Sequence, residues 1–230
     1  MSTGKDQPSG ENVLALAERA RISVKIDKIE SYWNEVRGRR LVPSRCEIDP
    51  RGLGAVLSHA FILERITGGL ARFRIAGSHL SEVTGLELRQ MPISALVLPG
   101  SRELLSDALD AVFDEPAMVR MRVTSPGGFG RAPLEGELIL MPLRSDLGDV
   151  DRVLGGLVFH GAIGRTPRRI EIVSQSRKSL TGYAGPVHRP DLPETDATAA
   201  PRTPFLSPRT EPTQPKGPDR SYLKLVVSND

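Results

Sequence analysis

The feature that most constrains the fold of this chain is the order in which two kinds of hydrophobic periodicity follow one another. Five segments are predicted to be strands, three of them from the alternation of a half-buried strand and the last from an apolar run that favours a central position covered on both faces. They are residues 60–66, 70–76, 117–124, 134–143 and 152–160. Between the second and third of them, residues 101–115 repeat apolar side chains at helical spacing. The loops between neighbouring strands are short, which favours antiparallel partners. The order therefore predicts an α+β fold, with a five-stranded antiparallel sheet and helices on one of its faces.

The first two predicted strands form a hairpin around the turn sequence Thr67-Gly68-Gly69. Alternation along the second strand predicts one buried and one solvated face, because successive side chains point to opposite sides of a sheet. The expected buried face carries Ala71, Phe73 and Ile75, and the expected solvated face carries Arg72 and Arg74.

Two helices are predicted ahead of the sheet. The first spans residues 25–36, where Ile26, Ile29, Trp33 and Val36 recur at helical spacing and form one apolar stripe. Asp49-Pro50 opens a second, shorter helix, because Asp accepts free amide groups at an N-cap and Pro fits the first helical position. The stripe suits either the sheet of its own chain or that of a second copy, so a homodimer is one expected assembly.

The composition divides the chain into four parts. Residues 1–22 are expected to be a flexible N-terminal segment, and residues 23–164 the folded domain with its flanking helices. Residues 165–220 are expected to be a disordered linker, basic at first and then rich in proline, since nine of the chain's 19 prolines lie between Pro186 and Pro218. Residues 221–230 contain a short apolar motif, Tyr-Leu-Lys-Leu-Val-Val, suited to adding as a strand to the edge of a sheet.

Two local motifs match a known family. They are Y-W-N-E-V-R-G-R-R-L-V-P-S-R-C-E-I-D-P-R-G-L-G at residues 32–54 and F-R-I-A-G-S-H-L-S-E-V-T-G at residues 73–85. Together they resemble an alphaproteobacterial family of single-PAS-domain proteins of largely unknown function, over roughly Ile29 to Gly161. The resemblance implies a PAS-like fold, in which helices cover one face of the sheet and leave a small cavity beneath them. It implies no catalytic residues.

Neither an enzyme nor a cofactor is predicted. The four histidines lack metal-ligand spacing, and the sequence has no nucleophile or phosphate-binding motif in a suitable context. Cys46 precedes the first strand, whereas a flavin-reactive cysteine would lie in the helical insert of a PAS domain. His79 is the one histidine placed to bind haem, and a solvent-facing histidine is the simpler interpretation.

The ligand, if the domain binds one, is expected to be small and hydrophobic. Apolar side chains of the helices and of the concave sheet face would line its cavity. The candidates are Leu80, Val83, Leu96, Leu109, Phe113, Leu138, Leu140 and Leu157. The alternative is that these side chains fill the core, and that the protein is a constitutive adaptor that senses nothing.

A basic surface is predicted after the first helix. Its candidates are Arg37, Arg39, Arg40 and Arg45, which form a solvated rim suited to an acidic protein partner. The arginines followed by D-P-R-G-L-G also resemble a cyclic-dinucleotide site of the PilZ type, but the arginine spacing is one residue too long and the expected serine is Arg51. The favoured function is non-enzymatic regulation through a ligand or a protein partner.

Charge and hydropathy narrow the partners and the compartment. The formal net charge of +3 is too small to favour nucleic acid. The N-terminus lacks the apolar core of a signal peptide, and no apolar run approaches the ~18 residues of a membrane span. A single cysteine suits a reducing compartment. We therefore expect a cytoplasmic protein without nucleic-acid or membrane partners.

Overall fold

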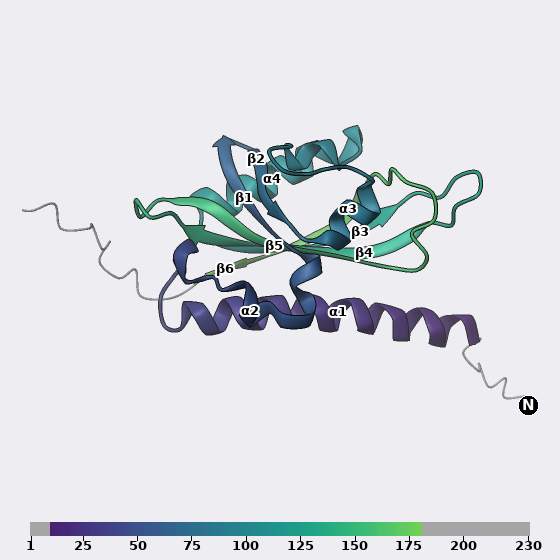
Figure 1. The fold of residues 1–230 in the computed structure, drawn as a ribbon, viewed down its shortest axis with the longest axis horizontal. Helices are drawn as coiled ribbons and strands as arrows, with labels where there is room; N and C mark the ends of the chain where they lie inside the picture. Colours follow the sequence, from purple (N-terminus) through teal and green to yellow (C-terminus); the bar gives the residue numbers. More distant parts are fainter. Residues whose placement is uncertain (1–9, 181–230) are drawn as a thin grey trace, which may run out of the picture. The chain divides into compact units, whose positions relative to one another are not determined.

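A six-stranded antiparallel sheet organises the fold (Figure 1). The computed structural model describes the backbone of residues 10–180 and the side chains of residues 20–180. The strands are β1 Ala60–Thr67, β2 Leu70–Ala76, β3 Ala117–Ser125, β4 Leu134–Arg144, β5 Val150–His160 and β6 Glu171–Ser179. Their order across the sheet is β2-β1-β5-β4-β3-β6. The α+β class and the five predicted strands are confirmed, and the sheet has one strand more than predicted.

The additional strand, β6, lies in the segment predicted to be a linker. It pairs with β3 from Ala117↔Ser179 to Thr124↔Glu171. Most of its side chains are polar, so its sequence lacks the alternation that marks a half-buried strand, and only Ile172 is buried. The backbone amide of Ile172 also donates to the Ser101 hydroxyl at 3.0 Å. Residues 171–179 therefore belong to the domain, while residues 181–220 and the motif at 221–230 lie outside the described residues.

A buried arginine anchors the loop that leads into β6. Arg168 is almost fully buried, and its guanidinium donates to the carbonyl oxygens of Ile163 and Ala132 at 2.5–2.8 Å. Burial, with a smaller effect of the Arg131 charge, lowers the pKa of Arg168. The carbonyl groups stabilise the cation where no water reaches it.

Helices cover both faces of the sheet rather than one. The α-helices are α1 Gly10–Arg37, α2 Pro50–Leu53, α3 Ser78–Thr84 and α4 Arg102–Asp114. Short 3₁₀ helices are η1 Arg45–Glu47, η2 Gly54–His59, η3 Ile93–Ala95 and η4 Pro99–Ser101. Figure 1 shows α1 and α2 below the sheet and α3 and α4 above it. Helix α1 begins at Gly10, so residues 10–22 are helical and the boundary predicted after residue 22 is wrong.

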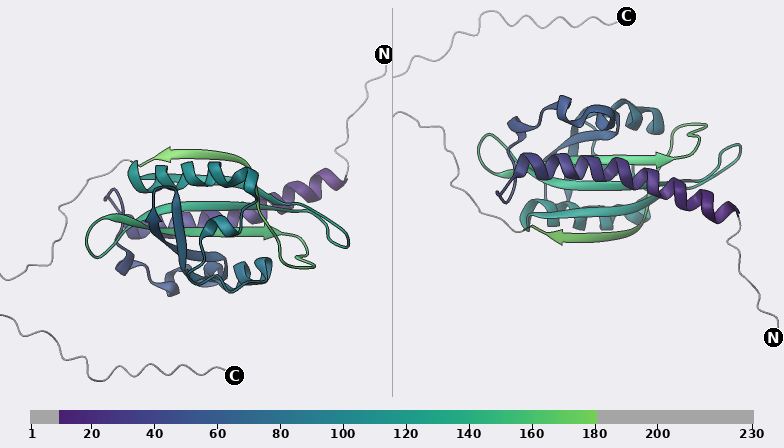
Figure 2. Two further views of the ribbon diagram at one scale, coloured as in Figure 1. Left: turned by 90° about the horizontal axis from the view of Figure 1, so that it is seen from above. Right: turned by 90° about the horizontal axis from the view of Figure 1, so that it is seen from below.

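The apolar stripe of α1 covers the sheet of its own chain. Ile26, Ile29 and Trp33 are fully buried against side chains of β4 and β5. The indole nitrogen of Trp33 donates to the carbonyl oxygen of Pro142 on β4 at 3.0 Å. Figure 2 shows α1 lying across this face of the sheet. The stripe is therefore part of the internal core, and the alternative in which it covers a second copy is wrong.

Two consecutive glycines on β5 let both layers approach the sheet closely. A Cβ atom at Gly156 would lie 2.6 Å from the Ile29 side chain of α1. A Cβ atom at Gly155 would lie 2.2 Å from the ring of Phe61 on the other face. Because successive residues of a strand point to opposite faces, each glycine makes room on one side.

A β-bulge changes the faces of the hairpin. Ile62 pairs with Ile75 and Leu63 pairs with Phe73, so Arg74 is the additional residue in β2. Ile75 therefore points to the same face as Arg72 and is 52% exposed, whereas Phe73 is fully buried. The prediction that Ile75 shares the buried face of Phe73 is wrong, because simple alternation does not continue through a bulge.

Replacing Trp33 by alanine is expected to lower the free energy of unfolding by ~3–5 kcal/mol, the usual cost of removing a buried aromatic side chain. The substitution also leaves the Pro142 carbonyl without its donor. Urea denaturation measures the change. Val24→Ala, at an exposed position of the same helix, is the matched control and is expected to change stability by no more than ~0.5 kcal/mol. A loss below ~1 kcal/mol for Trp33→Ala would contradict the docking of α1.

Candidate functional site

The eight side chains predicted to line a ligand cavity lie together in one core. They come from α3, from the end of η3, from α4 and from the facing strands β4 and β5. All of them, Leu80, Val83, Leu96, Leu109, Phe113, Leu138, Leu140 and Leu157, are at most 4% exposed. The rings of Phe61 and Phe73 pack edge to face at 5.4 Å in the same cluster. The eight side chains thus belong to one core cluster, and their role in ligand binding stays a prediction.

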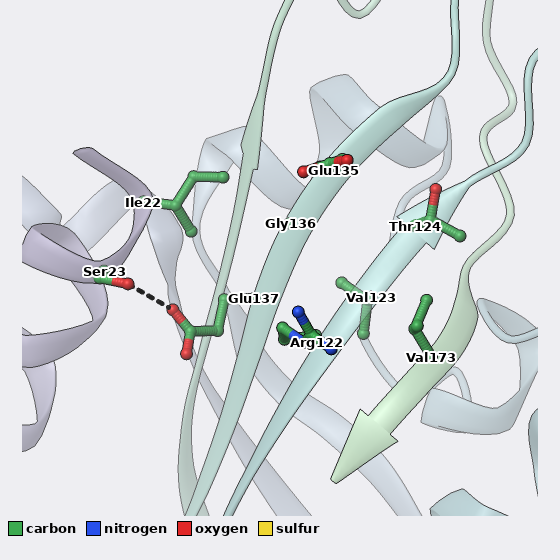
Figure 3. Close-up of a pocket in the computed structure, with 9 residues that line it drawn as sticks. All are labelled: Ile22, Ser23, Arg122, Val123, Thr124, Glu135, Gly136, Glu137 and Val173. Carbon is green, nitrogen blue, oxygen red and sulfur yellow. Dashed lines mark hydrogen bonds between the residues drawn. The ribbon is translucent and has the colours of Figure 1, made fainter. Parts of the chain in front are cut away.

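An open groove lies on the opposite face of the sheet, beside α1 (Figure 3). Its volume is about 360 Å³. None of the eight predicted ligand-binding residues lines it. Its lining comes from α1, β3, β4 and β6, namely Ile22, Ser23, Arg122, Val123, Thr124, Glu135, Gly136, Glu137 and Val173. No single sequence pattern reveals this groove, because its residues come from four separate elements.

The charged side chains of the groove are held by neighbours. Glu137 accepts a hydrogen bond from the Ser23 hydroxyl at 3.3 Å and is paired with the Arg120 guanidinium beside it. Arg120 also reaches Asp27 of α1 at 2.7 Å. Arg122 donates to the hydroxyl of Ser174 at 3.0 Å. The groove therefore offers the Glu137 carboxylate and the Arg122 guanidinium, each held by a neighbour, beside the second carboxylate of Glu135 and the apolar side chains of Ile22, Val123 and Val173. This arrangement suits a small amphipathic molecule.

Two of the four arginines predicted to form a basic surface serve the fold. Arg40 donates to the Val36 carbonyl at the end of α1 and to the carboxylate of Glu47 at 2.8 Å. The hydrogen bond from Arg40 lowers the pKa of Glu47. The guanidinium of Arg37 lies over the ring of Trp33, 5.2 Å from its centre.

Of the four predicted arginines, only Arg39 is exposed. Arg45, at the start of η1, is half-buried. The predicted surface is therefore smaller than the sequence indicates, because Arg37 and Arg40 are engaged in contacts within the chain.

A contact between the buried His59 and the partly buried His79 joins η2 and α3, and Lys25 links the pair to α1. The rings of His59 and His79 lie edge to face, with centres 4.2 Å apart. The Lys25 ammonium of α1 donates to Nε2 of His59 at 2.9 Å. Burial, with the nearby charges of His79 and Lys25, lowers the pKa of His59 to about 4. Burial also lowers the pKa of His79, although the carboxylate of Glu82 at 4.0 Å opposes the shift.

One known protein family matches most of the folded part of this chain. The family model for the PAS domain matches residues 22–158. The chain belongs to the PAS domain family. No curated protein and no solved structure matches it. The match runs from the buried part of α1 to β5, so β6 and the groove residue Val173 lie beyond the matched part of the PAS domain.

The described part of this PAS domain contains few groups suited to metal chemistry. Among the described side chains, those of residues 20–180, no three from His, Cys, Asp or Glu are arranged to hold a metal ion. His79, the candidate haem ligand, packs against His59 instead of facing solvent. The adjacency of the two histidines had no signal in the sequence, because 19 residues, most of them in the β1–β2 hairpin, lie between them. The helices of the same range include none that is long and apolar enough to span a membrane.

The stability of the PAS domain is expected to fall as the pH is lowered from about 6.5 to about 4. In this window the unfolded chain binds a proton at His59 that the folded chain does not bind. The stabilising contribution of His59 is fully present above pH 6.5 and is lost by about pH 4, a change on the order of 3 kcal/mol. Urea denaturation at several pH values measures it. His59→Gln is expected to flatten the dependence, and parallel curves for both proteins would contradict the assignment to His59.

Proposed function

We propose that this PAS protein is a non-enzymatic regulator that acts by binding another protein through its surface. Membership of the PAS domain family supports a sensory or regulatory role. The choice between an internal ligand and a surface contact depends on whether the core has room for a ligand.

The observation that carries the proposal is the near-zero exposure of the residues predicted to line a cavity. A cavity able to hold even a water molecule leaves part of each lining side chain accessible to a water-sized probe. Leu80, Val83 and Leu140 are 0% exposed, and the other five candidates are at most 4% exposed. The packing supports a filled core, in which these side chains stabilise the fold and a signal leaves through the surface.

A second candidate function is binding of a small molecule in the groove of Figure 3. Its volume of about 360 Å³ lies within the roughly 300–1,000 Å³ of known ligand sites. The carboxylate of Glu137 and the guanidinium of Arg122 lie at its walls. This arrangement favours a ligand with an apolar body and a polar group.

A substitution that enlarges a core side chain tests whether the core is filled. Val83→Leu adds one methylene group, which costs ~1–3 kcal/mol in a close-packed core. In a cavity, the same group would be neutral or stabilising. Thermal denaturation measures the difference. Val24→Leu, at an exposed valine of α1, is the matched control and is expected to leave the melting temperature unchanged. Stabilisation by Val83→Leu would contradict the filled core.

Native mass spectrometry of the protein purified from its own host tests the proposed function itself. We expect the chain in complex with a second protein and without a small molecule at a one-to-one ratio. A retained small molecule and no protein partner would overturn the proposal. Loss of that molecule in Val173→Trp, which narrows the groove, would then favour the second candidate.

A further inference from the structure

A mixed basic and apolar surface lies on the β2–β1–β5 side of the sheet, on the face that α1 covers elsewhere. We call it the hairpin patch and define it as Ile66, Arg72, Arg74, Ile75 and Arg152. Ile66 and Ile75 are 54% and 52% exposed, although isoleucine is among the residues most often buried. Arg72 and Arg74 keep 41% and 45% of their side chains exposed.

Strand pairing places the arginines and Ile75 around one carboxylate. Glu64 pairs with Arg72 on one side and with Arg152 on the other. Ile75 pairs with Ile62, which lies two residues before Glu64 and therefore on the same face. Ile66 follows Glu64 at a second irregularity of the pairing, between Arg65 and Thr67, and is exposed near the end of β1.

One half-buried carboxylate organises the three guanidinium groups. Glu64 lies 2.8 Å from Arg72, 2.9 Å from Arg152 and 3.6 Å from Arg74. Burial alone would raise the pKa of Glu64, but the hydrogen bond from Arg72 and the arginine charges lower it.

The patch keeps an excess of positive charge. Arg152 also pairs with Asp151 at 2.7 Å, so three cations face two carboxylates. The remaining donors of Arg72 and Arg74 are held in place by Glu64 and open to solvent. Guanidinium groups in fixed positions suit the recognition of carboxylates.

The backbone of the adjacent strand is already engaged. The backbone amide of Phe73 in β2 donates to the carbonyl oxygen of Met91 at 2.9 Å, and the carbonyl oxygen of Phe73 accepts from the amide of Gln90 at 2.8 Å. A partner therefore contacts the side chains of the patch and does not add a strand to β2 at this position.

We propose that the hairpin patch binds an acidic segment of a partner protein, with carboxylates on Arg72 and Arg74 and apolar side chains on Ile66 and Ile75. The inference rests on the proposed function, since it names the surface and the chemistry of the protein contact. Arginine beside exposed apolar side chains is the composition of protein interfaces.

The small charge excess favours a protein over other polyanions. Binding to an anionic membrane through charge takes clusters of about 4–8 basic residues. Nucleic acids likewise require several lysines or arginines, one for each phosphate contact. The hairpin patch has three arginines, and two carboxylates lie among them.

The test uses the full chain and a fluorescent peptide in which glutamate and leucine alternate, with serines for solubility. The same peptide with glutamine in place of glutamate is the matched probe. Anisotropy titrations are expected to show binding of the acidic peptide alone, weakened by salt. The double variant Arg72→Gln/Arg74→Gln is expected to weaken binding on the order of tenfold. Arg102→Gln, at an exposed arginine of α4, is the control and is expected to change binding less than about twofold.

A second variant avoids the ion-pair cluster. Ile66 is exposed, and Ile66→Ser leaves every arginine contact of Glu64 in place, so the variant is expected to fold like the wild type. It is expected to bind the peptide several-fold more weakly, because it removes apolar surface from the patch. Equal binding by wild type, Ile66→Ser and the double variant would overturn the inference. So would arginine-dependent binding to phosphatidylserine vesicles or duplex DNA without binding to the peptide.

Native mass spectrometry separates this failure from failure of the proposed function. A protein partner that stays bound to the double variant would refute the hairpin patch and leave the proposed function standing. Absence of any protein partner from the wild type would refute the proposed function as well.

Discussion

The contact of α1 with the centre of the sheet sets the conditions for the rest of this structure. Trp33 is fully buried and donates to the Pro142 carbonyl, and Gly156 leaves room for Ile29. With α4 on the opposite side, β4 and β5 are covered on both faces, which explains their long apolar stretches. Side chains can pack closely on both faces of the central strands of such a sheet. The side chains of the two resulting cores are therefore almost inaccessible to solvent.

Helices α1 and α2 do not cover the whole of their face of the sheet, so side chains toward both of its edges stay exposed. Each flank is organised by one nearly buried carboxylate bound to arginine. On the β3 side, Glu137 holds Arg120 beside the groove. On the β1 side, Glu64 holds the three arginines of the hairpin patch. Ion pairing reduces the free-energy cost of placing these carboxylates against the sheet, because each mostly buried carboxylate accepts hydrogen bonds from arginine.

This arrangement supports the proposal that the protein acts through its surface rather than through its interior. The side chains that the family resemblance assigns to a cavity contact one another closely, whereas the open flanks present fixed charges beside apolar groups. Fixed donors give specificity, because a partner without carboxylates would remove water from the arginines and offer no hydrogen bonds in return. Binding of such a partner would therefore be weaker. The groove and the hairpin patch lie on opposite flanks of α1, so they provide two separate surfaces for binding.

Local patterns of apolar residues in the sequence determined three features: the apolar stripe of α1, the five strands β1 to β5, and the set of side chains in the core beneath α4. These features depend on spacing within one segment, and burial of an apolar face follows from that spacing. The tertiary structure alone decided the others. Strand β6 is held by backbone pairing with β3, which polar side chains do not reveal. The bulge at Arg74 turned Ile75 to the arginine face, and only the pairing register of β1 and β2 specifies a bulge. The contact of His59 with His79 and the charges around Glu64 likewise depend on segments brought together by the sheet, and no single segment of sequence contains that information.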